Sequence, residues 1–111
     1  MLFRSDIQRV RRYGKSIAHP FFVLIYLRDK ATQNAPVGII ASKAVGGAVE
    51  RNRAKRVLRS AATELHESIL PECMILLIAR QAILDHDTPE ITEILAKQLK
   101  KAEIYRESAQ K

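Results

Sequence analysis

The sequence predicts a single α+β domain over residues 1–111, with helices packed on a small sheet. Three runs rich in β-branched or aromatic residues have the composition of strands, and three segments carry apolar residues at helical spacing. Their order, helix, strand, strand, helix, strand, helix, is typical of a sheet covered by helices. With 111 residues, 47% of them hydrophobic, the chain is long enough to bury a core.

The expected elements follow one another with short connections. In order they are a helix over 5–14, strands over 19–27 and 37–43, a helix over 48–68, a strand over 73–80 and a helix over 87–102. Gly14 can end the first helix, and Gly46 and Gly47 break the pattern before the second. The third strand, CMILLIAR, is apolar throughout and is therefore expected to be covered on both faces. Thr88 is expected to cap the last helix, with Pro89 as its first residue.

The formal net charge of +7 is concentrated in parts of the chain. Residues 1–15 carry five basic groups and one acid, residues 43–59 carry six and one, and residues 60–96 carry one basic group and seven acids. Such concentration indicates a surface that binds a polyanion, and the abundance of arginine favours phosphate as its ligand. The alternative is a charged surface that only keeps the protein soluble.

Residues 48–59, AVERNRAKRVLR, place this charge on the predicted second helix. The basic face consists of the row Arg51, Lys55 and Arg59, the adjacent row Asn52 and Arg56, and Arg53 at the flank. The apolar residues expected on the opposite side, against the sheet, are Ala54, Val57, Leu58, Ala61 and Leu65. Like charges at i, i+4 cost a few tenths of a kcal/mol each in an isolated helix. A polyanionic partner explains their repetition better than stability does.

The sequence shows no pattern typical of protein-borne catalysis or of a metal site. The three histidines and Cys73 lack ligand spacing, and the acidic residues 85–93 cluster at a helix start, where the helix dipole accounts for them. Cys73 is expected to be a buried thiol in a reducing cytoplasm. No stretch approaches the roughly 18 apolar residues of a membrane span, and the first ten residues lack the apolar part of a signal peptide. A cytoplasmic protein without a membrane partner is expected.

Residues 42–59, SKAVGGAVERNRAKRVLR, resemble the signature of the protein subunit of bacterial ribonuclease P. That family's pattern is Ser-Lys, a short turn with Gly, then Ala-Val-x-Arg-Asn-Arg-x-Lys-Arg-x-x-Arg, and the flanking RYGKS, HPFF, VGIIAS and ILLIAR agree with it. The resemblance implies a two-layer α/β sandwich with a four-stranded mixed sheet, similar to ribosomal protein domain 2-like folds. It also implies a short fourth strand near residues 15–18 and a left-handed βαβ crossover.

The resemblance further implies a role in removing the 5′ leader of precursor tRNA. In that family the catalytic subunit is an RNA with bound Mg²⁺, and the protein, a monomer within the holoenzyme, binds this RNA and the leader. The residues implied to contact the catalytic RNA are Lys43, Arg51, Asn52, Arg53, Lys55, Arg56 and Arg59. Those implied to form a leader cleft between the first helix and the sheet are Ile7, Arg11, Phe21, Ile25 and Ser42. Ile7, Arg11 and Ile25 stand where the family often has aromatic residues. Phe21, which is expected to share a strand face with Ile25, can partly replace them.

Two other functions use the same features. A ribosome-associated protein could hold structured rRNA with the same basic helix. A free-standing nuclease could use Asp85 and Asp87 with a metal ion.

Overall fold

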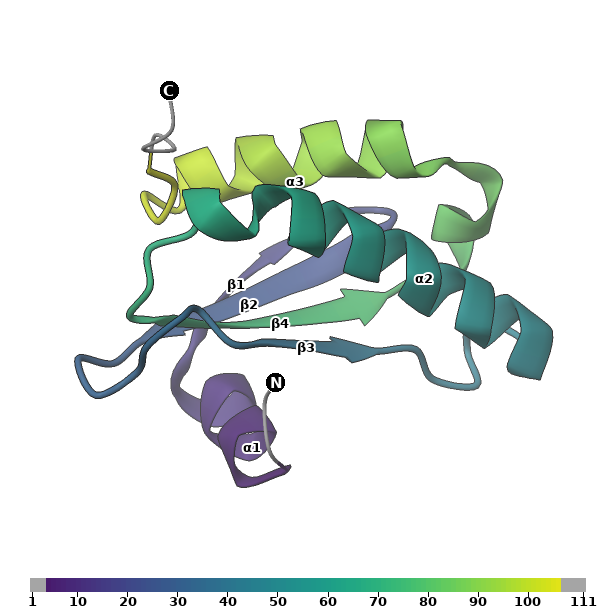
Figure 1. Cartoon of the computed structure of the whole chain (residues 1–111). Helices are drawn as coiled ribbons and strands as arrows, with labels where there is room; N and C mark the ends of the chain where they lie inside the picture. Colours follow the sequence, from purple (N-terminus) through teal and green to yellow (C-terminus); the bar gives the residue numbers. More distant parts are fainter. Residues whose placement is uncertain (1–3, 107–111) are drawn as a thin grey trace.

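A four-stranded mixed sheet lies at the centre of the computed structural model, which describes residues 4–106 (Figure 1). Its strands are β1 (Lys15–Ala18), β2 (Phe22–Arg28), β3 (Val37–Ile40) and β4 (Cys73–Ala79), in the order β1-β2-β4-β3. Strand β2 pairs antiparallel with β1 and β4, whereas β3 is parallel to β4. The fourth strand implied by the family resemblance is confirmed as β1.

Helices cover both faces of this sheet. Helices α2 (Ala48–Leu65) and α3 (Thr88–Lys101) lie side by side on one face, and α1 (Arg4–Tyr13) lies against the other (Figure 1). Short 3₁₀ turns follow α2 as η1 (His66–Ser68) and precede α3 as η2 (Gln81–Asp85). The predicted α+β class is confirmed, and β3, α2 and β4 form the parallel βαβ unit that the implied crossover requires. Within residues 4–106, every helix is too short or too polar to cross a membrane.

Side chains alternate along β4 and divide the core between the two faces of the sheet. Cys73, Ile75 and Leu77 point to the layer of α2 and α3, whereas Met74 and Leu76 point to α1. All five are buried, so the prediction that this strand is covered on both faces is confirmed. Burying a side chain of the size of Leu77 stabilises the fold by about 1.5–3 kcal/mol.

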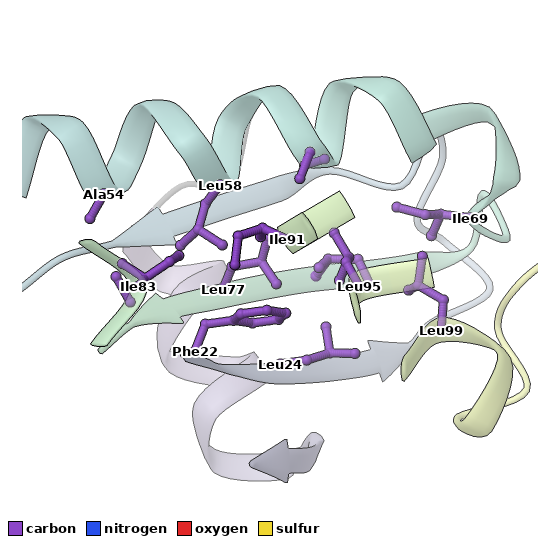
Figure 2. Packing of buried hydrophobic residues seen from close by; sticks show 14 of the residues in the cluster. Phe22, Leu24, Ala54, Leu58, Ile69, Leu77, Ile83, Ile91, Leu95 and Leu99 are labelled. Atoms are coloured by element: carbon purple, nitrogen blue, oxygen red, sulfur yellow. The ribbon is translucent and has the colours of Figure 1, made fainter. Parts of the chain in front are cut away.

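The buried residues form two hydrophobic clusters, one on each face of the sheet. The apolar stripes of α2 and α3 pack over the larger one (Figure 2). The predicted residues of α2 that are fully buried are Ala54, Leu58 and Ala61, and α3 contributes the fully buried Ile91, Leu95 and Leu99. Val57 and Leu65, also predicted for the stripe of α2, are only partly buried at its margins. Three of the buried residues of α2 are alanines, whose small side chains let this helix approach its neighbours closely.

Asp87, not Thr88, caps α3. The Asp87 carboxylate accepts a hydrogen bond from the backbone N–H of Glu90 at 3.2 Å, and the Asp87 backbone is extended with φ −102°. The prediction for Thr88 is wrong by one residue, because both residue types can cap a helix. Thr88 lies inside the helix, where its carbonyl accepts a hydrogen bond from the Thr92 hydroxyl at 2.8 Å. Pro89 still falls in the first turn, where its missing N–H costs nothing.

Candidate nucleic-acid interface

The residues predicted to contact the RNA lie on α2 and on the loop that precedes it. The exposed ones are Lys43, Asn52, Arg53, Arg56 and Arg59. Arg51 and Lys55 are partly buried. Arg51 precedes the buried Leu58 by seven residues, which is nearly two helical turns, so both side chains leave the helix in similar directions. The prediction that Arg51 lies opposite the apolar stripe is therefore wrong.

The basic side chains of α2 form no ion pair with an acid among residues 4–106. The ion pairs formed among residues 4–106 lie elsewhere and join Arg9 to Asp6 and Asp29 and Arg28 to Glu72, and the His86 ring lies within hydrogen-bond distance of Glu90. An arginine without an acidic partner keeps its planar fork of N–H donors free for phosphate. The exposed face of α2 is therefore able to bind a polyanion.

Two grooves flank α2, and different arginines of this helix line each of them. One, of about 730 Å³, runs along the β3 edge of the sheet and is lined by Arg59 and by Ile7 of α1. The other, of about 620 Å³, lies between α2 and the start of α3. Its α2 wall carries Arg53 and Arg56, and the facing wall carries acidic residues, namely Asp85, Asp87 and Glu90. A polyanion in this second groove is attracted to α2 and repelled by the facing wall.

The loop over residues 42–47 holds Lys43 beside the first turn of α2. The Ser42 carbonyl accepts a hydrogen bond from the N–H of Val45 at 3.0 Å, and the Lys43 carbonyl accepts one from the N–H of Gly46 at 3.1 Å. Val45 is 1% exposed and anchors the loop in the core. Gly46 has φ 148°, a conformation that residues with a side chain rarely adopt. The backbone at Lys43 is thereby fixed while its side chain stays in solvent.

Three of the predicted cleft residues lie on the α1 side of the sheet. Ile7 and Ile25 are partly buried and belong to the smaller apolar cluster between α1 and the sheet. Arg11 follows Ile7 by one helical turn and is exposed, so a positive charge lies beside this apolar surface. Ser42 is exposed beyond the end of β3, and its hydroxyl accepts a hydrogen bond from the N–H of Ala44 at 3.3 Å.

Sequence reasoning missed other members of this surface. Leu27, Ile40 and Ile78 are partly buried in the same cluster. The two-residue alternation of side chains along a strand could have found them, because Leu27 follows Ile25 by two positions. Ile40 and Ile78 are direct partners in the pairing of β3 with β4, so finding them also requires knowing how these two strands pair.

Phe21 lies away from these residues. The centroid of its ring is 3.8 Å from that of His86 and 4.8 Å from that of His19, and it packs against the larger cluster below α2 and α3. The prediction that Phe21 shares a strand face with Ile25 is wrong, because β2 begins at Phe22 and the alternation does not extend to the residue before it.

The acidic residues at the start of α3 have structural partners. Asp87 caps the helix, and the Glu90 carboxylate lies 2.8 Å from Nδ1 of His86. In the described part of the chain, no three His, Cys, Asp or Glu side chains are grouped so that they could hold a metal ion. Cys73 is buried as predicted, and burial raises the pKa of its thiol, which disfavours the thiolate needed for nucleophilic attack.

Comparison with known proteins gives consistent matches. The family model for ribonuclease P matches residues 1–103. The ribonuclease P protein component of Listeria welshimeri is 35% identical over 103 residues, which cover 93% of this chain and 87% of that protein. The component of Staphylococcus carnosus is 38% identical over 101 residues, which cover 91% and 87%.

Solved structures agree with these matches. The RNase P protein of Staphylococcus aureus superimposes with a TM-score of 0.79 at 33% identity, covering 96% of both chains. The RNase P protein of Thermotoga maritima superimposes with a TM-score of 0.78 at 24% identity, covering 91% of this chain and 94% of that one. The second likeness is one of fold.

Proposed function

Because this chain belongs to the bacterial ribonuclease P protein family, we propose that it binds the catalytic RNA of ribonuclease P and the 5′ leader of precursor tRNA. It would thereby assist the Mg²⁺-dependent endonucleolytic removal of the leader, as a monomer within a cytoplasmic holoenzyme. The observation that best supports this proposal is the set of exposed arginines on α2, which form no ion pair with other residues in the range 4–106.

In the proposed complex, α2 holds the catalytic RNA through its phosphates. The guanidinium groups of Arg53, Arg56 and Arg59 bind phosphate oxygens in pairs. Asn52, exposed among them, has both a donor and an acceptor and can contact a 2′-hydroxyl or a base edge. These contacts fix the RNA and lower the repulsion between its strands.

No side chain is proposed to take part in bond cleavage. Mg²⁺ bound mainly by the RNA would supply the activated water for hydrolysis. The protein contributes positive charge, which favours the close approach of catalytic RNA and substrate.

The leader would bind on the α1 side, next to Ile7 and Ile25, with Arg11 and Ser42 at the rim. These positions offer apolar contact and charge but no aromatic ring, and Phe21 lies on the other side of the sheet. We therefore propose that the leader is held more by phosphate contacts and by the guanidinium of Arg11 than by aromatic stacking.

One assay tests this function against its two alternatives. Precursor tRNA is incubated at low Mg²⁺ with the protein alone, with a bacterial ribonuclease P RNA alone, and with both. Cleavage only with both is the expected result. Cleavage by the protein alone would support a free-standing nuclease, and RNA binding without any effect on cleavage would support a protein that only holds structured RNA.

A further inference from the structure

Glu50 is the only acid among residues 43–59, and its carboxylate binds the backbone instead of a neighbouring arginine. Its Oε1 accepts a hydrogen bond from the N–H of Gly47 at 3.0 Å. Arg53, three residues later, is within the range at which helical side chains pair, yet the two form no ion pair. The carboxylate is thus turned towards the loop that precedes α2.

The glycines of this loop are packed around the Glu50 side chain. A Cβ added at Gly46 would lie 2.8 Å from Cβ of Glu50, closer than such atoms approach in proteins, and 3.0 Å from Cγ of Glu50, tighter than most such contacts. A Cβ added at Gly47 would lie 3.2 Å from Oε1. The exposed Glu50 side chain therefore lies directly against both glycines, and the three residues form one contact unit.

The same unit includes Lys43. The N–H of Gly46 donates to the Lys43 carbonyl, and the N–H of Gly47 donates to Glu50. A change in the position of the glycines would therefore move the backbone from which Lys43 projects. The buried Val45, whose N–H donates to the Ser42 carbonyl, holds the same loop, so Glu50 acts together with it.

We propose that Glu50 is a positioning residue for RNA binding, which holds the loop so that Lys43 extends the basic surface of α2. The proposal rests on the function proposed above. Charge alone predicts the opposite effect, since removing the only acid of this segment makes it more positive and should strengthen RNA binding. The direction of the change therefore separates positioning from simple electrostatics.

Two variants of equal charge provide the test. Glu50→Gln removes the charge but keeps an oxygen that can accept the hydrogen bond from Gly47, whereas Glu50→Ala removes both. Their affinity for a bacterial ribonuclease P RNA is measured across a salt series. We expect Glu50→Gln to bind at least as tightly as the unmodified chain, and Glu50→Ala to bind about two- to fivefold more weakly, the loss expected when one exposed charge contact is no longer held. Equal affinities of the two variants would overturn the proposal.

A measurement without RNA checks the loop itself. Gly47 is the N-cap of α2, so Glu50→Ala also removes a cap and should lower the melting temperature slightly. The Gly47 amide should exchange its hydrogen faster in Glu50→Ala than in Glu50→Gln, while both variants remain folded. If both variants exchange this amide at the rate of the unmodified chain, Glu50 does not hold the loop and the proposal is wrong. This result is independent of whether the chain binds RNA.

A double variant shows whether Lys43 carries the effect. In a Lys43→Ala background, Glu50→Ala should weaken RNA binding little further. Arg53→Ala should weaken RNA binding in this background by the same factor as in the unmodified chain. An undiminished effect of Glu50→Ala without Lys43 would contradict the proposal. If Arg53→Ala and Lys43→Ala also leave binding unchanged, the proposed RNA-binding function fails, a result that differs from failure of the role of Glu50 alone.

Discussion

Arg53 and Arg56 are exposed arginines whose removal tests RNA binding without disturbing the core. We expect Arg53→Ala and Arg56→Ala each to weaken binding of the catalytic RNA by about two- to fivefold, which corresponds to the ~0.5–1 kcal/mol of an exposed charge contact. Each should also reduce the slope of log affinity against log salt by about 0.7–0.9 per lost phosphate contact. The measurement is a binding titration at several salt concentrations.

A matched control is Lys97→Ala, which removes an exposed positive charge from α3 instead of α2. It should change neither the affinity nor the salt slope appreciably. Equal losses for all three variants would mean that the RNA responds to net charge and that α2 has no special part in binding.

Arg11 is the exposed charge beside the apolar cluster on the α1 side, and it should make leader binding sensitive to salt. Its guanidinium can stack on a base and pair with a phosphate. We expect Arg11→Ala to lower the ratio of holoenzyme affinities for precursor over mature tRNA and to flatten its dependence on salt. For comparison, stacking on an aromatic ring contributes about 1–3 kcal/mol per base, and its removal would lower the ratio at every salt concentration.

Arg12→Ala is the control for this prediction. Arg12 is the next residue of α1, is also exposed, and lies 5.6 Å over the ring of Tyr13. Because it points about 100° away from Arg11 around the helix, its loss should leave the affinity ratio nearly unchanged. The cleft assignment would be wrong if Arg12→Ala had the larger effect.

At the scale of elements, losing an apolar side chain should destabilise the fold strongly on one face of α2 and hardly at all on the other. Leu58 is 0% exposed, whereas Val49 is 77% exposed on the same helix. We expect Leu58→Ala to lower the free energy of unfolding by about 2–5 kcal/mol, because it leaves a cavity under α2. Val49→Ala should change it by no more than about 0.5 kcal/mol. Urea denaturation followed by circular dichroism measures both, and similar values for the two variants would show that the orientation of α2 is wrong.

The attachment of α1 to the rest of the fold should depend on pH. Arg9 of α1 donates a hydrogen bond to Asp29, after β2, at 2.6 Å, and this contact lowers the pKa of Asp29 from its usual value of 3.8. A carboxylate with a lowered pKa stabilises the fold above its unfolded pKa of about 3.9 and loses this contribution as the pH falls through the folded value. We expect Asp29→Asn to lower the urea midpoint at pH 7 and to have a smaller effect at pH 3.

An acid outside such a contact provides the comparison. Glu93 is exposed on α3 and forms no ion pair within residues 4–106. Glu93→Gln should therefore shift the urea midpoint less at pH 7 than Asp29→Asn does. An Asp29→Asn effect that is equally large at both pH values would mean that its cause is not the charge.

The sequence predicts the long elements of this fold better than the short ones. Strands β2 and β4 and the two long helices follow from periodicity, since each buries a face along most of its length. Strand β3 has only four residues, all partly buried, and is recognised by its apolar, β-branched composition. Strand β1 follows from neither signal, because it spans only residues 15–18 at the sheet edge and only Ile17 is even partly buried. Family resemblance located it where the pattern could not.

The candidate site shows the same limit. Exposure of Arg53, Arg56 and Arg59 follows from helical spacing. The position of Phe21 depends on where β2 begins, and that of Arg51 on its two-turn distance from Leu58. The role of Glu50 depends on a loop geometry that two glycines allow but do not specify. For Phe21 the deciding contact, with His86, joins separate elements, and a local pattern cannot contain it. The seven-residue spacing of Arg51 and Leu58 is local and is contained in the sequence.

On the scale of the whole molecule, the two proposed binding surfaces lie mainly on opposite faces of the sheet and meet at its β3 edge, where Arg59 and Ile7 line one groove. Helix α2 lies on one face and α1 on the other (Figure 1). Arg53 lies in the groove between α2 and the start of α3, whereas Arg11 is on α1. Residues 60–96, which hold seven of the twelve acids, include most of α3, which lies on the same face of the sheet as α2. This arrangement would let one small domain contact two RNAs at once.

If the two surfaces act independently, their effects on binding should add. Sites more than about 7–10 Å apart that share no partner contribute additively to free energy, within about 0.5 kcal/mol. We expect Arg53→Ala to change the affinity for the catalytic RNA alone, and Arg11→Ala to change the ratio for precursor over mature tRNA. In the double variant, the affinity for the catalytic RNA should fall as much as in Arg53→Ala alone. The holoenzyme's affinity ratio for precursor over mature tRNA should change as much as in Arg11→Ala alone. A leader effect of Arg11→Ala that disappears in the Arg53→Ala background would show that both arginines serve one continuous RNA surface, because the loss of one contact would then have already removed the other.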